Sequence, residues 1–75
     1  MKLRPIGSNL TELHIGTLCV VFSYETPVAG WDDQGAFKTD TKFSATTSKH
    51  IRKALGAAFD NARVLPQSQI EGLLQ

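Results

Sequence analysis

Residues 37–62 read FKTDTKFSATTSKHIRKALGAAFDNA and contain the one clear change of apolar period in the chain. Up to residue 45, apolar and polar side chains alternate with a period of two, which is typical of a strand with one buried face. Beyond residue 47, apolar residues recur at the spacing of one helix face: Ile51, Leu55, Ala58, Phe59 and Ala62. The stretch therefore predicts a strand over residues 37–45 and an amphipathic helix over residues 47–64, which ends before Pro66.

Further strands are predicted upstream of this stretch. Residues 13–15 alternate apolar and polar side chains, and a turn at Gly16 leads to a second strand over residues 17–24, so the two segments should form a hairpin. Pro27 cannot donate a hydrogen bond to a strand ladder. Residues 26–31 are therefore expected to form at most a short or edge strand.

The predicted fold class is α+β. We expect a small antiparallel sheet of three to four strands, built from β-hairpins and packed by one amphipathic C-terminal helix. A length of 75 residues leaves room for one domain, residues 1–75. Ser68 and Glu71 have the spacing of a capping box, so residues 65–75 are expected to form an appended short helix or a flexible tail.

Composition restricts the class of protein. The hydrophobic share of 41% suits a folded domain, and the net charge of +1 is too small to require nucleic acid or an anionic membrane as partner. The longest apolar run, residues 18–22, is far shorter than the roughly 20 residues of a membrane-spanning helix. The single cysteine, Cys19, cannot form an internal disulfide. These features predict a soluble protein of a reducing cytoplasm.

Three stretches resemble small uncharacterised proteins that phages, prophages and plasmids encode. They are MKLRPIGSN at residues 1–9, FSYETPVA at residues 22–29, and residues 39–51, which contain TTSKHI. That family has no known activity and no assigned site that could be transferred to this chain. The resemblance implies a gene on a mobile element and a bacterial host cytoplasm.

One catalytic hypothesis joins Glu12, His14 and Cys19. A two-residue turn at residues 15–16 pairs His14 with Thr17 and Glu12 with Cys19, so the three side chains share one face. A thiol, an imidazole and a carboxylate together meet the requirements of nucleophilic catalysis. No oxyanion donor or helix N-terminus is evident around the thiol, so a chance placement is favoured. We therefore assign no catalytic residue and do not expect an enzyme, with chemistry at Cys19 as a remote alternative.

No metal or cofactor is expected. Turn chemistry explains Asp32 and Asp33, and their spacing to Asp40 fits no known cation-binding loop. His14 and His50 lie far apart in sequence, with no second ligand at the spacing typical of zinc sites.

Charge supplies the candidate binding site. Four basic residues fall on the side of the predicted helix away from its apolar stripe: Lys49, Arg52, Lys53 and Arg63. This basic face would suit a phosphate backbone or an acidic protein surface, although a plain solvated face is the simpler interpretation. Trp31, beside the turn at residues 32–35, is either a cap on the sheet or an interface anchor.

Two functions follow as hypotheses. The first is a binding module that acts by stoichiometric interaction with a host protein or complex, for example in host takeover or defence inhibition. It rests on the small size, the lack of a catalytic constellation, the resemblance and Trp31. The alternative is a nucleic-acid-binding protein that uses the basic face, against which the near-neutral net charge weighs. No membrane partner is expected, and a homodimer is left open.

Overall fold

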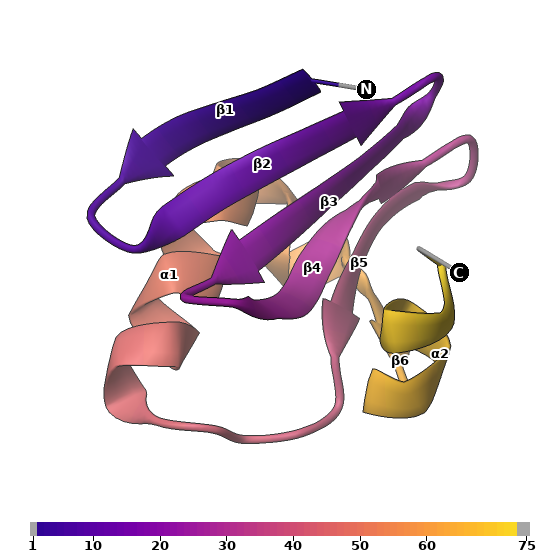
Figure 1. Ribbon diagram of the computed structural model, residues 1–75. Helices are drawn as coiled ribbons and strands as arrows, with labels where there is room; N and C mark the ends of the chain where they lie inside the picture. Colours follow the sequence, from indigo (N-terminus) through magenta and orange to yellow (C-terminus); the bar gives the residue numbers. More distant parts are fainter. Residues whose placement is uncertain (1, 74–75) are drawn as a thin grey trace.

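The structure is a computed structural model that describes residues 2–73, and its centre is one six-stranded mixed sheet (Figure 1). The strands are β1 (Lys2–Gly7), β2 (Leu10–Ile15), β3 (Leu18–Ser23), β4 (Thr26–Asp32), β5 (Gly35–Thr39) and β6 (Arg63–Leu65). The helical elements are α1 (Ala45–Leu55), the 3-10 helix η1 (Gly56–Asn61) and α2 (Gln67–Gly72). The strands lie in chain order across the sheet, each antiparallel to the next, except that β6 runs parallel to β5.

The expected antiparallel sheet of three to four strands is therefore wrong, because the sheet has six strands and is mixed. Strands β1 and β6 were not predicted. Strand β4 is not an edge strand, since it pairs with both β3 and β5. Pro27 does not prevent this, because it lies near the start of β4, next to a bulge at which the register to β3 shifts.

The strand expected over residues 37–45 is also shorter than its pattern. Strand β5 ends at Thr39, and residues 40–44 are all exposed. The amide of Asp40 donates to the carbonyl of Leu65 at 2.9 Å, at the point where the chain leaves the sheet. The alternation of residues 40–44 therefore does not correspond to a strand with a buried face.

The helix expected over residues 47–64 is divided in two. Ser44 caps α1, because its side-chain oxygen accepts a hydrogen bond from the amide of Thr47 at 3.1 Å. Helix α1 ends at Gly56, which has a φ of +55° and donates its N–H to the carbonyl of Arg52. Glycine adopts this left-handed conformation without the strain that a Cβ would add. The chain then forms η1 and returns to the sheet as β6.

The hairpin between β2 and β3 differs from the expected register by an even number of residues. Ile15 pairs with Leu18, so the loop consists of Gly16 and Thr17. Gly16 has a φ of +57°, as suits the first position of a type II′ turn. An even shift leaves each side chain on the face that the sequence assigned to it.

Ser23 identifies the side of the sheet that faces α1. Its hydroxyl lies 3.1 Å from Oγ1 of Thr47 and 2.7 Å from Nδ1 of His50, both on α1. Because side chains alternate along a strand, Val21 points to the same side as Ser23, and Phe22 to the other. We call the side of β1–β3 that carries Ser23 the helix face, and the opposite side the open face.

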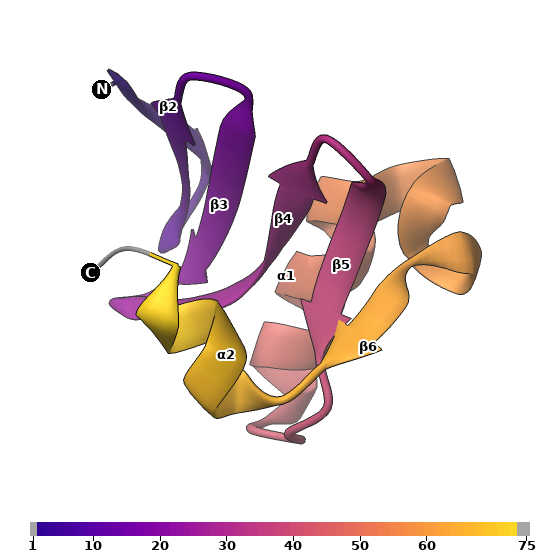
Figure 2. The same cartoon turned by 90° about the vertical axis from the view of Figure 1, so that its right-hand side faces the viewer.

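The main core fills the space between the helix face and α1. Its buried members are Leu10, Val21, Val28, Ala29, Ile51 and Leu55. Helix α2 contacts β4 and lies on the other side of the sheet from α1 (Figure 2), where Ile70 is fully buried. Helix α2 occupies most of the tail expected at residues 65–75, and residues 74 and 75 lie outside the described part of the chain. Within residues 2–73, every helix falls short of the length and hydrophobicity that a membrane crossing requires.

Candidate functional site

The open face carries apolar side chains, and no described helix lies in front of β1 and β2 (Figure 1). Cross-strand pairing places Leu3 opposite Leu13, and Ile15 opposite Leu18, so these side chains share the open face. Leu3 exposes 66% of its surface and Ile15 exposes 40%. We call Leu3, Ile15 and Leu18 the apolar strip. Exposed apolar side chains on one face of a sheet form a candidate contact surface.

A hollow of about 680 Å³ lies at the opposite end of β1 and β2 from the apolar strip. Its lining residues come from two hairpin turns, β1–β2 and β3–β4, and the strands beside them: Pro5, Gly7, Asn9, Thr11, Tyr24, Glu25 and Thr26. Tyr24 is 54% exposed, and its amide donates to the carbonyl of Asn9 at 2.7 Å. Both residues have positive φ angles, 58° and 60°, so two neighbouring turns hold a strained backbone beside an exposed aromatic ring.

The outer edge of β1 is poorly suited to pair with another strand. Pro5 has no N–H to donate, and the register to β2 shifts between Pro5 and Gly7. Lys2 and Arg4 are exposed on the same strand, and charged edge residues discourage edge-to-edge pairing. A partner of this region would therefore contact its side chains rather than extend the sheet.

The basic face predicted from the sequence is only partly assembled. Lys49, Arg52 and Lys53 are all exposed on α1. Arg63 lies apart from them on β6, where its guanidinium is 2.5 Å from Oδ1 of Asp32 and also donates to the carbonyl of Gly35. Arg63 therefore serves to hold the β4–β5 turn against β6.

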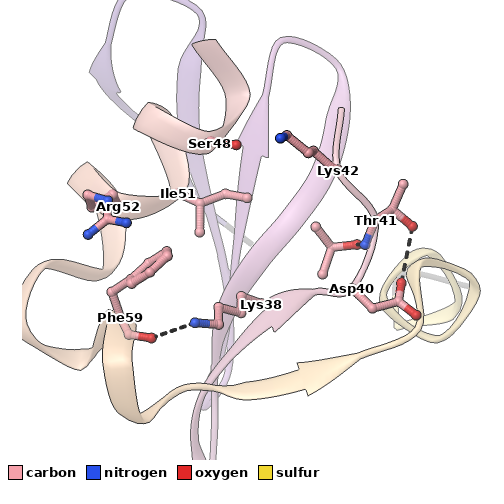
Figure 3. A pocket seen from close by; sticks show the side chains of 9 residues that line it. Lys38, Asp40, Thr41, Lys42, Ser48, Ile51, Arg52 and Phe59 are labelled. Carbon is pink, nitrogen blue, oxygen red and sulfur yellow. Dashed lines mark hydrogen bonds between the residues drawn. The ribbon is translucent and has the colours of Figure 1, made fainter. Parts of the chain in front are cut away.

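Two lysines that the sequence did not single out extend the charge of α1 towards β5 (Figure 3). Lys38 and Lys42 line a pocket of about 290 Å³ together with Arg52 and Phe59. The ammonium of Lys38 lies 3.9 Å from the ring centre of Phe59, and the guanidinium of Arg52 lies 4.3 Å from it. Asp40 is the one acidic residue in the lining. The sequence feature that could have identified these lysines is their four-residue spacing after the turn at residues 32–35.

Trp31 lies on the helix face and not at a free surface. It is half-buried, pairs with Cys19 of β3 and Ala36 of β5, and packs against the main core. Its ring is therefore already engaged within the protein.

Glu12, His14 and Cys19 lie together on the helix face. Nε2 of His14 is 3.0 Å from Oε1 of Glu12 and 3.8 Å from Sγ of Cys19. Burial, and to a lesser extent the negative charge of Glu12, raise the pKa of the Cys19 thiol to about 11. A thiol with a raised pKa is a poor nucleophile at neutral pH, so this environment does not favour the catalytic hypothesis.

Comparison with known proteins gives one assignment. A family model described as a family of unknown function (DUF8033) matches residues 1–72. The chain belongs to this family. The match spans every strand and both α-helices, and it confirms the expectation of an uncharacterised family. No curated protein and no solved structure matches the chain significantly.

Proposed function

We propose that this chain is a small binding module that acts by stoichiometric interaction with another protein. The supporting observation is the open face, where the apolar strip spans β1 to β3 and the hollow beside Tyr24 lies at the opposite end of β1 and β2. Exposed apolar patches rimmed by polar groups are typical of interaction sites, and tyrosine is enriched among the residues that dominate binding energy. The blocked edge of β1 favours recognition by side-chain packing.

The resemblance noted in the sequence supplies the setting of this proposal. The gene belongs to a phage-type mobile element, and the partner is a protein or complex of the bacterial host cytoplasm. Host takeover and inhibition of a defence complex are activities that a small protein achieves by occupying a surface, without chemistry of its own.

Leu3→Asp should strongly weaken this interaction. The chain is used to capture host proteins from nuclease-treated lysate, and the captured protein is purified and titrated. Loss of a residue that dominates binding costs about 2 kcal/mol or more, and a buried carboxylate adds to this, so the Kd should rise by about 30-fold or more. Leu3 is largely exposed, so the thermal midpoint should change little.

Val64→Asp is the matched control, because Val64 is 58% exposed on β6, at the far edge of the sheet. Its Kd should equal that of the parent. Equal affinities for the Leu3 and Val64 variants would refute the open face as the binding site. A second copy of this chain on the open face would instead give a concentration-dependent dimer that Leu3→Asp dissociates.

A nucleic-acid partner is the second candidate function. It is favoured by Lys49, Arg52 and Lys53, which are exposed along α1, and by the neighbouring pocket of Lys38 and Lys42. Among the described residues, none of these five side chains forms an ion pair, so their charges are available to phosphates. The net charge of +1 still favours the protein partner.

Lys49→Gln with Arg52→Gln tests the second candidate in titrations against single-stranded and duplex DNA and RNA at several salt concentrations. If these side chains contact phosphates, binding should weaken for every sequence. The slope of log K against log salt should flatten by about 0.7–0.9 for each lost contact. Lys2→Gln with Arg4→Gln removes the same charge from β1 and should leave the slope nearly unchanged. Equal changes in both double variants would rule out a specific role for α1.

A further inference from the structure

The proposed protein interaction assigns no role to Glu12, His14 and Cys19, although these three side chains form a close cluster. Glu12 and His14 are two residues apart on β2, and Cys19 lies directly opposite His14 on β3. Both strands are paired on each side, so the sheet holds the three side chains in fixed relative positions. The three offer one oxygen, one nitrogen and one sulfur, all within 4.8 Å of one another.

We propose that Glu12, His14 and Cys19 bind a zinc ion. Nε2 of His14 lies 3.0 Å from Oε1 of Glu12 and 3.8 Å from Sγ of Cys19, and all three ligand atoms lie within 4.8 Å of one another. In a tetrahedral site with zinc bond lengths of about 2.0–2.3 Å, the ligand atoms lie about 3.3–3.8 Å apart, so these three are close to a zinc-binding spacing. Side-chain rotations that move the ligand atoms by up to about 1 Å would complete the tetrahedral coordination. Cys19 releases its thiol proton to solvent when the zinc–sulfur bond forms.

The donor set selects zinc over the hard cations. Calcium and magnesium take oxygen ligands almost exclusively, whereas imidazole and thiolate suit zinc. Three protein ligands leave a fourth tetrahedral position. The side chain of His14 is 42% exposed, so the ion can enter from solvent and that position is open to water or to a partner's side chain.

Two cations share the helix face with this cluster. Arg4 pairs across the strands with Glu12, and Lys2 with His14. Both are exposed, and neither forms an ion pair with Glu12 in the described part of the chain, so solvent screens their charges. The carboxylate of Glu12 therefore stays available to an ion.

Cobalt(II) titration of the untagged, metal-free chain under reducing conditions tests the site, because thiolate coordination gives a charge-transfer band in the near ultraviolet. We expect one cobalt ion per chain, with the band fully displaced by zinc. Cys19→Ala should abolish the band. His14→Ala and Glu12→Gln should each weaken zinc binding by at least about tenfold, since loss of a residue that only hydrogen-bonds to a metal ligand already costs about 10–100-fold.

His50→Gln and Asp33→Asn are the matched controls, one histidine and one carboxylate outside the cluster, and both should bind zinc like the parent. Circular dichroism checks that each variant is folded, and Cys19→Ser replaces Cys19→Ala if the latter is not. The proposal is overturned if no thiolate band develops, or if His14→Ala and Glu12→Gln leave the affinity unchanged. Leu3→Asp should bind zinc normally, so failure of the protein-binding proposal is distinguishable from failure of the zinc site.

Discussion

Gly30→Ala should unfold a large part of the protein at room temperature. A Cβ at this position would lie 2.1 Å from the backbone oxygen of Cys19 and 2.8 Å from Cζ of Phe37. The Cys19 oxygen belongs to β3 and cannot retreat without disturbing the β3–β4 ladder. We expect a loss of about 3 kcal/mol or more, against a total stability of only a few kcal/mol for a domain of this size.

Urea and thermal denaturation of Gly30→Ala and Gly72→Ala measure this effect. Gly72 is the matched control, because a Cβ there would meet nothing within 4 Å and the residue lies in α2. Gly72→Ala should be neutral or stabilising by up to about 1 kcal/mol. A Gly30 variant as stable as the parent would show that the backbones of β3 and β4 lie further apart at this position.

Phe37→Ala should cost about 3–5 kcal/mol, because it removes one of the largest fully buried side chains and leaves a cavity. Phe37 is 0% exposed and lies directly across the strands from Gly30, whose missing side chain leaves room for the ring. The same ring supports β4 and the centre of the sheet.

Phe43→Ala is the control for Phe37→Ala in urea denaturation. Phe43 is 44% exposed in the loop of residues 40–44, so its loss should change stability by no more than about 0.5–1 kcal/mol. Similar costs for the two substitutions would contradict the assignment of Phe37 to the core.

The central hairpin was predictable because its signal is local. Alternation over residues 13–15 and 17–24 marked β2 and β3, and an even register shift kept Glu12, His14 and Cys19 on one face. Strand β1 was missed because Pro5 interrupts it and its side chains are mostly exposed. Such a strand is stabilised by its neighbour and not by its own pattern.

The end of the chain was less predictable because long-range pairing decides it. The helical pattern continues through Gly56, but the positive φ of this glycine ends α1 there. Arg63 consequently lies on β6, beside Asp32, and is not part of the basic face of α1. A three-residue strand has almost no local signal, so β6 exists because β5 offers it an edge.

The candidate sites were likewise predictable where local sequence decides them and unpredictable where tertiary packing does. Local spacing placed Lys49, Arg52 and Lys53 on one side of α1. The open face could not be foreseen, since only tertiary packing decides which side of the sheet α1 covers. The one signal available was the alternation of Leu13 and Ile15.

The chain order of the strands also bears on how the protein is assembled during synthesis. Strands β1 to β5 each pair with the strand just made, so a nascent chain can add them one at a time as they leave the ribosome. Among the described strands, β6 alone must close a longer loop, over residues 40–62, to reach its partner. Translation thus delivers the strands in the sequence in which the sheet grows, and the final pairing secures α1 against a sheet that already exists.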